Sequence, residues 1–69
     1  MKKIVAVISS DYGFLFDTDN QLVVQQFMNK IRNSEYRLVT EEKVKGKELT
    51  LIPIKCKKSF FNNSWSFIF

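Results

Sequence analysis

The chain has 69 residues, a net charge of +4, a single cysteine and no histidine. A chain this short forms one domain, which we place at residues 1–69, and it buries only about 60% of its unfolded surface. One cysteine excludes an internal disulfide and favours a reducing compartment. No apolar run approaches the roughly 18 residues that span a bilayer. We therefore expect a cytoplasmic protein without a membrane partner.

The beginning of the sequence predicts two strands joined by a turn. Lys3 to Ser9 is a continuous β-branched run, typical of a strand that is covered on both faces and central in its sheet. Ser10 to Gly13 is a turn signal, in which Gly13 can take a positive φ. The short apolar segment Phe14 to Phe16 follows, and we expect it to pair back on the first strand.

A clear helical period extends from Thr18 to Arg32. Thr18 and Gln21 have the spacing of a capping box, and Asn33 tolerates the left-handed conformation that commonly ends a helix. The acids Asp17 and Asp19 are expected at the positive end of the helix dipole. Gln25 should face water. The apolar stripe, which needs a sheet to cover it, consists of Leu22, Val23, Val24, Phe27, Met28 and Ile31.

The next segment predicts a second hairpin, made by residues 36–44 and 47–56 with Lys45-Gly46 as its turn. A two-residue loop places Lys43 opposite Glu48 as a cross-strand ion pair, whereas a three-residue loop would change these partners. The charged residues around the turn should project into water. Pro53 cannot donate to a strand ladder, which indicates an edge or a bulge at that position.

The sequence ends with Ser59 to Phe69, which predicts a third hairpin with a turn at Asn62-Asn63. Its last strand would present Trp65, Phe67 and Phe69 on one face. The expected order is β-β-α-β-β-β. With short connections throughout, this order predicts an α+β domain, in which one amphipathic helix packs on one face of a single antiparallel sheet.

Candidate catalytic and metal-binding residues are few. Cys56 lies between two lysines that could lower its pKa, but we interpret it as a small packed side chain. Asp17 and Asp19 begin like a calcium loop, yet Leu22 and Met28 occupy the positions where that loop needs glycine and glutamate. The absence of histidine removes the commonest general base. We expect no enzyme activity, no metal and no cofactor.

Lysines and aromatic residues lie close together near the end of the chain, as they do in proteins that bind single-stranded nucleic acid. The residues are Lys55, Lys57, Lys58, Phe60, Phe61 and Trp65. Two observations weaken this interpretation. The same half of the chain carries four acids, and so small a core needs its aromatic side chains. Nucleic-acid binding is therefore kept as the alternative function.

Our first hypothesis is a non-catalytic protein-binding module that inhibits or sequesters a larger protein. The abundance of residues with AT-rich codons suggests a low-GC bacterium or one of its phages, and in this general character the chain is similar to small phage proteins that block host enzymes or defence systems. A third hypothesis, a pocket for a small nucleotide, has only Lys2, Lys3 and the basic second half of the chain to support it.

The predicted binding surface is the end of the chain. A single helix is not expected to cover this aromatic strand in addition to the rest of the sheet. Because an exposed aromatic strand would aggregate in a monomer, we expect a homodimer with Trp65, Phe67 and Phe69 in its interface. The alternative is that these three residues complete a monomeric core. The target would contact the same region, because aromatic anchors dominate binding hot spots. The binding residues that we predict are Lys57, Lys58, Phe60, Phe61, Trp65, Phe67 and Phe69.

Overall fold

The computed structural model describes residues 3–62 and 64–68 and shows an α+β fold with one mixed five-stranded sheet and two short helices. The predicted α+β class is confirmed, but the sheet is not purely antiparallel. In chain order the elements are β1 (Ile4–Val7), β2 (Tyr12–Phe16), α1 (Gln21–Lys30), β3 (Arg37–Thr40), α2 (Glu41–Val44), β4 (Thr50–Lys58) and β5 (Trp65–Ile68).

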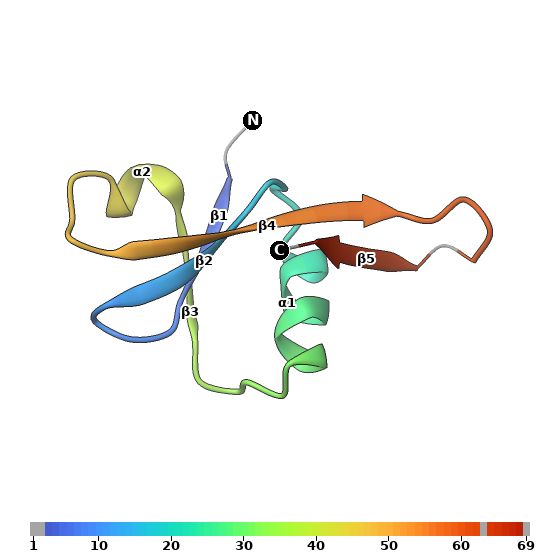
Figure 1. Ribbon diagram of the computed structural model, residues 1–69, viewed down its shortest axis with the longest axis horizontal. Coiled ribbons are helices and arrows are strands. Elements are labelled where there is room, and N and C mark those ends of the chain that lie inside the picture. The colour runs from blue at the N-terminus through green and yellow to red at the C-terminus, as the bar shows by residue number, and fades with distance from the viewer. Residues whose placement is uncertain (1–2, 63, 69) are drawn as a thin grey trace.

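The strands lie in the order β3-β1-β2-β4-β5. β1 pairs antiparallel with β2 and with β3, which confirms that the first strand is interior and that the second pairs back on it. β2 and β4 are parallel, and β4 and β5 are antiparallel. Figure 1 shows β4 as a long strand that crosses the molecule, from the side of α2 to that of α1.

Gly13 is required for close packing and not for a positive φ. Among the described glycines only Gly46 has a positive φ, of 87°. Gly13 is part of β2 and lies opposite Val7. A Cβ added to Gly13 would lie 2.7 Å from the carbonyl oxygen of Ala6. The prediction for this residue was therefore wrong, because the constraint comes from the neighbouring strand and not from the turn.

Helix α1 begins two residues later than the proposed capping box requires. Asn20 is the N-cap, and its side-chain oxygen accepts a hydrogen bond from the backbone N–H of Leu22 at 3.0 Å. The Thr18 hydroxyl instead accepts from the backbone N–H of Asn20 at 3.1 Å. The predicted capping box is therefore wrong. Asparagine is as good an N-cap as threonine, and here it is the residue adjacent to the helix.

The buried face of α1 is narrower than the apolar stripe in the sequence. Val23, Val24, Phe27 and Met28 are buried, as predicted. Leu22 is 67% exposed and Ile31 is 40% exposed, so their predicted burial is wrong. The two lie outside the stripe that faces the sheet: Leu22 is on its flank, and Ile31 follows the last helical residue as the C-cap.

The helix ends at Lys30, two residues before the end of the predicted helical period, and the left-handed residue that follows it lies one residue earlier than predicted. Arg32, and not Asn33, has the left-handed conformation, with a φ of 56°. The backbone N–H of Asn33 donates to the carbonyl of Met28 at 3.0 Å, and that of Arg32 donates to Asn29 at 3.1 Å. These two bonds form a Schellman motif. A non-glycine residue in this conformation costs about 1 kcal/mol, which the motif has to offset.

The predicted hairpin of residues 36–56 does not form. β3 pairs with β1, and β4 is parallel to β2, so Lys43 and Glu48 are not cross-strand partners. Between the two strands the chain turns through α2, with Thr40 as its N-cap and Val44 buried. Two glutamates begin this helix, where the dipole favours acids. The residues from Glu42 to Glu48 are exposed apart from Val44, as expected for the charged segment.

The core lies between α1 and one face of the sheet. It is built from Ala6, Phe16, Val24, Phe27, Met28 and Ile54. The opposite face is covered in part: Val5 on that face is fully buried, and Val44 of α2 lines a cavity there together with Val7. The segment that contains α2 does not reach the other end of this face, where Pro53 and Ile68 are exposed.

Candidate functional site

The end of the chain forms a two-stranded arm, by which we mean residues 55–62 and 64–68. β2 accompanies β4 only as far as Ile54, and from Lys55 onward β4 is paired with β5. Figure 1 shows the arm, in orange and red, extending beyond the rest of the sheet. Because β2 ends where the arm begins, the arm is joined to the rest of the sheet only at its base.

Asp17 fixes the base of the arm. Its backbone N–H donates to the carbonyl of Ile54 at 3.3 Å, and its carboxylate accepts from the backbone N–H of Cys56 at 2.8 Å. The carboxylate thus continues the pairing of β4 after β2 has ended. Asp17 and Asp19 both precede the first helical turn, which contains no acid. The predicted role of Asp17 at the helix terminus is therefore replaced by this contact.

Cys56 is half-buried beside Asp17, and its thiol is not activated. Burial is the largest cause that raises its pKa, from 9.0 to about 11, and the Asp17 carboxylate raises it further by hydrogen bonding and by repelling the thiolate. The neighbouring lysines do not reverse this direction. A thiol with a raised pKa is a weak nucleophile at neutral pH, which supports the interpretation of Cys56 as a packed side chain.

The tip of the arm carries two phenylalanines in water. Phe60 is 101% exposed and Phe61 is 99% exposed. The backbone N–H of Ser59 donates to the carbonyl of Ser64 at 2.8 Å and closes the turn. The connection therefore runs from Ser59 to Ser64 and is longer than the predicted two-residue turn. Asn63, the second residue of that prediction, lies outside the described residues.

The predicted basic and aromatic residues are divided between the two faces of the arm. The register pairs Lys58 with Trp65 and Lys57 with Ser66. Because side chains alternate along a strand, Lys58 and Trp65 share the face on which α1 lies, whereas Lys57 points to the opposite face. Phe60 and Phe61 are at the tip. The six predicted binding residues that the structure describes therefore do not form one patch.

Phe67 is partly buried and packs against the core, so it is not part of an exposed aromatic face. Its ring centroid is 5.0 Å from that of Phe27, and the Lys30 ammonium lies 5.4 Å from its centroid. Trp65 is half-buried, and Phe69 lies outside the described residues. The expectation that α1 could not cover this strand is thus wrong for Phe67. The homodimer built on these three residues stays a prediction.

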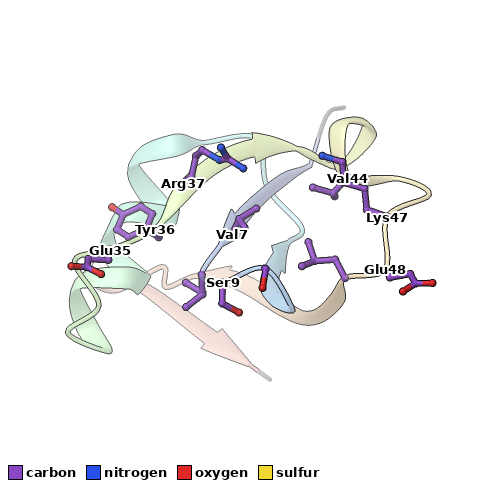
Figure 2. A pocket seen from close by; sticks show the side chains of 11 residues that line it. Val7, Ser9, Glu35, Tyr36, Arg37, Val44, Lys47 and Glu48 are labelled. Carbon is purple, nitrogen blue, oxygen red and sulfur yellow. The ribbon is translucent and has the colours of Figure 1, made fainter.

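A second candidate surface is a cavity of about 570 Å³ between the start of β3 and the loop that precedes β4. Figure 2 shows Val7 at its centre and the side chains of Arg37, Lys47, Glu35 and Glu48 around it. No motif in the sequence indicated this cavity, because its walls come from three separate segments. The acids and bases at its rim balance, so it has no charge preference for a nucleotide phosphate. Lys3 lies elsewhere, and Lys2 is outside the described residues.

Metal and membrane-spanning features are not found in the part of the chain that the structure describes. No group of three or more histidine, cysteine or acidic side chains could hold a metal ion there. Neither α1 nor α2 is long and apolar enough to cross a membrane. No family model matches the chain, and no curated protein or solved structure matches it significantly.

Proposed function

We propose that this protein is a non-catalytic binding module that attaches to a larger protein through the tip of its arm. One observation carries the proposal: Phe60 and Phe61 are almost completely exposed, at the end of an element that extends from the domain. Burying a phenylalanine side chain gains roughly 1.5–3 kcal/mol. A target with an apolar pocket would supply this gain, and aromatic residues are frequent anchors of this kind.

The shape of the arm supports an action by occlusion. A narrow element with an aromatic tip can enter a cleft of a larger protein, while the compact sheet and helix behind it cover the entrance. Such a module inhibits or sequesters its target without catalysing a reaction. The raised pKa of the Cys56 thiol agrees with a chain that has no nucleophilic role.

The test compares the tip with another exposed apolar pair. Phe60→Ser with Phe61→Ser should abolish capture of the target from a lysate of the cells in which the protein occurs. Leu22→Ser with Ile31→Ser removes exposed apolar side chains from α1 and should leave capture unchanged. Mass spectrometry identifies the proteins lost in the first variant only. If both variants capture the same proteins as the wild type, the tip is not the anchor.

Single-stranded nucleic acid is a second candidate ligand, favoured by the charge of the arm. From Lys55 to Phe69 the sequence has three lysines and no acid, and Lys58 lies directly opposite Trp65. A base could stack on the indole while lysines contact phosphates. Retention on heparin or single-stranded DNA should then fall steeply with salt, and Lys57→Glu with Lys58→Glu should abolish it. Elution of the wild type at low salt would exclude this candidate.

A further inference from the structure

The outer edge of β5 is open. β5 is the last strand in the sheet order, and within residues 3–62 and 64–68 no strand pairs with its outer side. Edge strands of this kind are normally protected from further pairing by charged side chains, proline or bulges. The sequence of β5, Trp-Ser-Phe-Ile, contains neither a charged residue nor proline. Within β5 itself nothing blocks a further strand, but the Lys30 ammonium already donates to the carbonyl of Trp65 at 3.3 Å and would have to be displaced from it.

The hydrogen-bond pattern shows which residues face outward. Ser59 and Ser64 form a hydrogen-bonded pair, and in an antiparallel ladder such pairs alternate with pairs whose backbone groups point away. The backbone N–H and C=O groups of Trp65 and Phe67 consequently point away from β4. One further contact supports this assignment of the outward groups: the carbonyl of Trp65 accepts a hydrogen bond from the Lys30 ammonium at 3.3 Å.

The positive charge around the edge favours one kind of binding partner. The arm contributes Lys55, Lys57 and Lys58, and α1 contributes Lys30 at the edge itself. A second copy of the chain, paired through the same edge, would bring an identical set of lysines alongside, and like charges disfavour such a complex. An acidic strand would instead be attracted by these lysines. The lysines therefore favour an acidic partner over self-association at this edge.

A cavity at the base of the arm supplies a site for an apolar side chain of the same partner. Its volume is about 390 Å³, and its lining includes Leu15, Pro53 and Ile68. Ile68 belongs to β5 and is 52% exposed. Two bases, Lys3 and Lys55, and one acid, Asp17, also line this cavity. The cavity lies on the β2 and β4 side of β5, and Ile68 is the residue that joins it to β5. An apolar side chain that reaches across Ile68 would find apolar walls there, with two lysines against one acid.

We propose that the outer edge of β5 binds an extended acidic segment of a partner protein by strand addition, with alternate apolar side chains of that segment packing against the arm. This proposal rests on the proposed function in that the arm is the docking element, but it uses backbone groups of Trp65 and Phe67 and not the tip. Strand addition supplies affinity through main-chain hydrogen bonds, and the side chains supply specificity.

The probe is a short synthetic peptide in which valine and glutamate alternate. With isotope-labelled protein, binding should slow hydrogen exchange at the amides of Trp65 and Phe67. A peptide of valine and lysine should bind at least about tenfold more weakly, and Lys55→Glu with Lys57→Glu should weaken the acidic peptide by about tenfold. Lys43→Glu with Lys45→Glu makes the same charge change in the exposed segment near α2 and should have no effect.

The possible outcomes separate this proposal from the previous one. Phe60→Ser with Phe61→Ser should retain peptide binding, even if it loses the target protein. Unprotected amides at millimolar acidic peptide would overturn strand addition, as would equal binding of the valine and lysine peptide. Protection of Trp65 and Phe67 without peptide, together with a dimeric mass by light scattering, would show that a second copy occupies the edge and would also overturn it.

Discussion

The two antiparallel hairpins of this molecule have opposite surroundings. The β1–β2 hairpin lies between β3 and β4 and contributes Val5, Ala6 and Phe16 to the buried interior. Within the described residues the two strands of the arm pair only with each other, and two exposed phenylalanines lie at their turn. The comparison teaches that full burial is found in one of the two hairpins, whereas the arm contributes only the partly buried Cys56 and Phe67 to the core. The arm can then present apolar side chains to a partner at little cost to folding.

The largest effect is expected where the two hairpins meet. The ring centroid of Phe27 lies 5.2 Å from that of Phe16 in the first hairpin and 5.0 Å from that of Phe67 in the arm. Phe27→Ala should lower the free energy of unfolding by roughly 3–5 kcal/mol, which would unfold most domains of this size. Gln25, which was expected to face water, is half-buried on the flank of α1, and Gln25→Ala should cost far less than Phe27→Ala. Urea unfolding followed by circular dichroism measures both, and equal losses would contradict the assigned face.

A smaller effect is expected from close packing within the first hairpin. Gly13→Ala places a Cβ 2.7 Å from the Ala6 carbonyl oxygen, and such overpacking should cost about 1–3 kcal/mol. Gly46→Ala is the matched control, because no atom lies within 4 Å of its Cβ and only its positive φ opposes alanine. This control should lose about 1–2 kcal/mol, the cost of a left-handed φ for a residue with a Cβ. A greater loss for Gly46→Ala would show that β1 and β2 separate easily.

The base of the arm should respond to alkaline pH. Folding raises the pKa of Cys56 from 9.0 to about 11, so the folded state holds the thiol proton more tightly. The resulting stabilisation is present in full below about pH 9 and is lost as pH rises through about 11. The wild type should therefore lose more stability than Cys56→Ala between these pH values. If the urea midpoints of the two proteins change equally with pH, the pKa of Cys56 is not raised by folding.

The smallest effect on stability is expected at the tip. Phe60→Ser with Phe61→Ser removes side chains that are already in water, so the free energy of unfolding should change by less than about 0.5 kcal/mol. Thermal unfolding by circular dichroism measures the change. A clear loss of stability would show that the tip packs against the domain in solution, and the contrast between the hairpins would then disappear.

Local patterns in the sequence predicted the elements that depend on nearby residues. The strand-turn-strand beginning, the helix with Val23 and Phe27 on its inner face, and the final hairpin all follow from periodicity and turn chemistry. The exposed lysines and phenylalanines of the arm were also identified as candidate binding residues. Local patterns did not predict which strands pair with each other.

The missed features depend on contacts between distant segments. Residues 36–56 have two β-rich runs around Lys45-Gly46, yet the free edges of β1 and β2 accept these runs separately. Pro53 did indicate an edge correctly, because β5 pairs with β4 only from Lys55 onward and Pro53 lies before that point. Asp17 looked like a helix-terminal acid, and its partner, Cys56, lies at the other end of the sequence.

The parallel pairing of β2 with β4 has a consequence for the order of folding. α1, β3 and α2 all lie between these two strands along the chain, so their pairing closes a long loop. Loop closure of this kind is entropically unfavourable, and folds with many non-local contacts form slowly. The arm is a local hairpin, which can close in microseconds. The apolar residues of β4 thus stay unprotected until β2 accepts the strand, and in that interval the nascent chain is most exposed to aggregation.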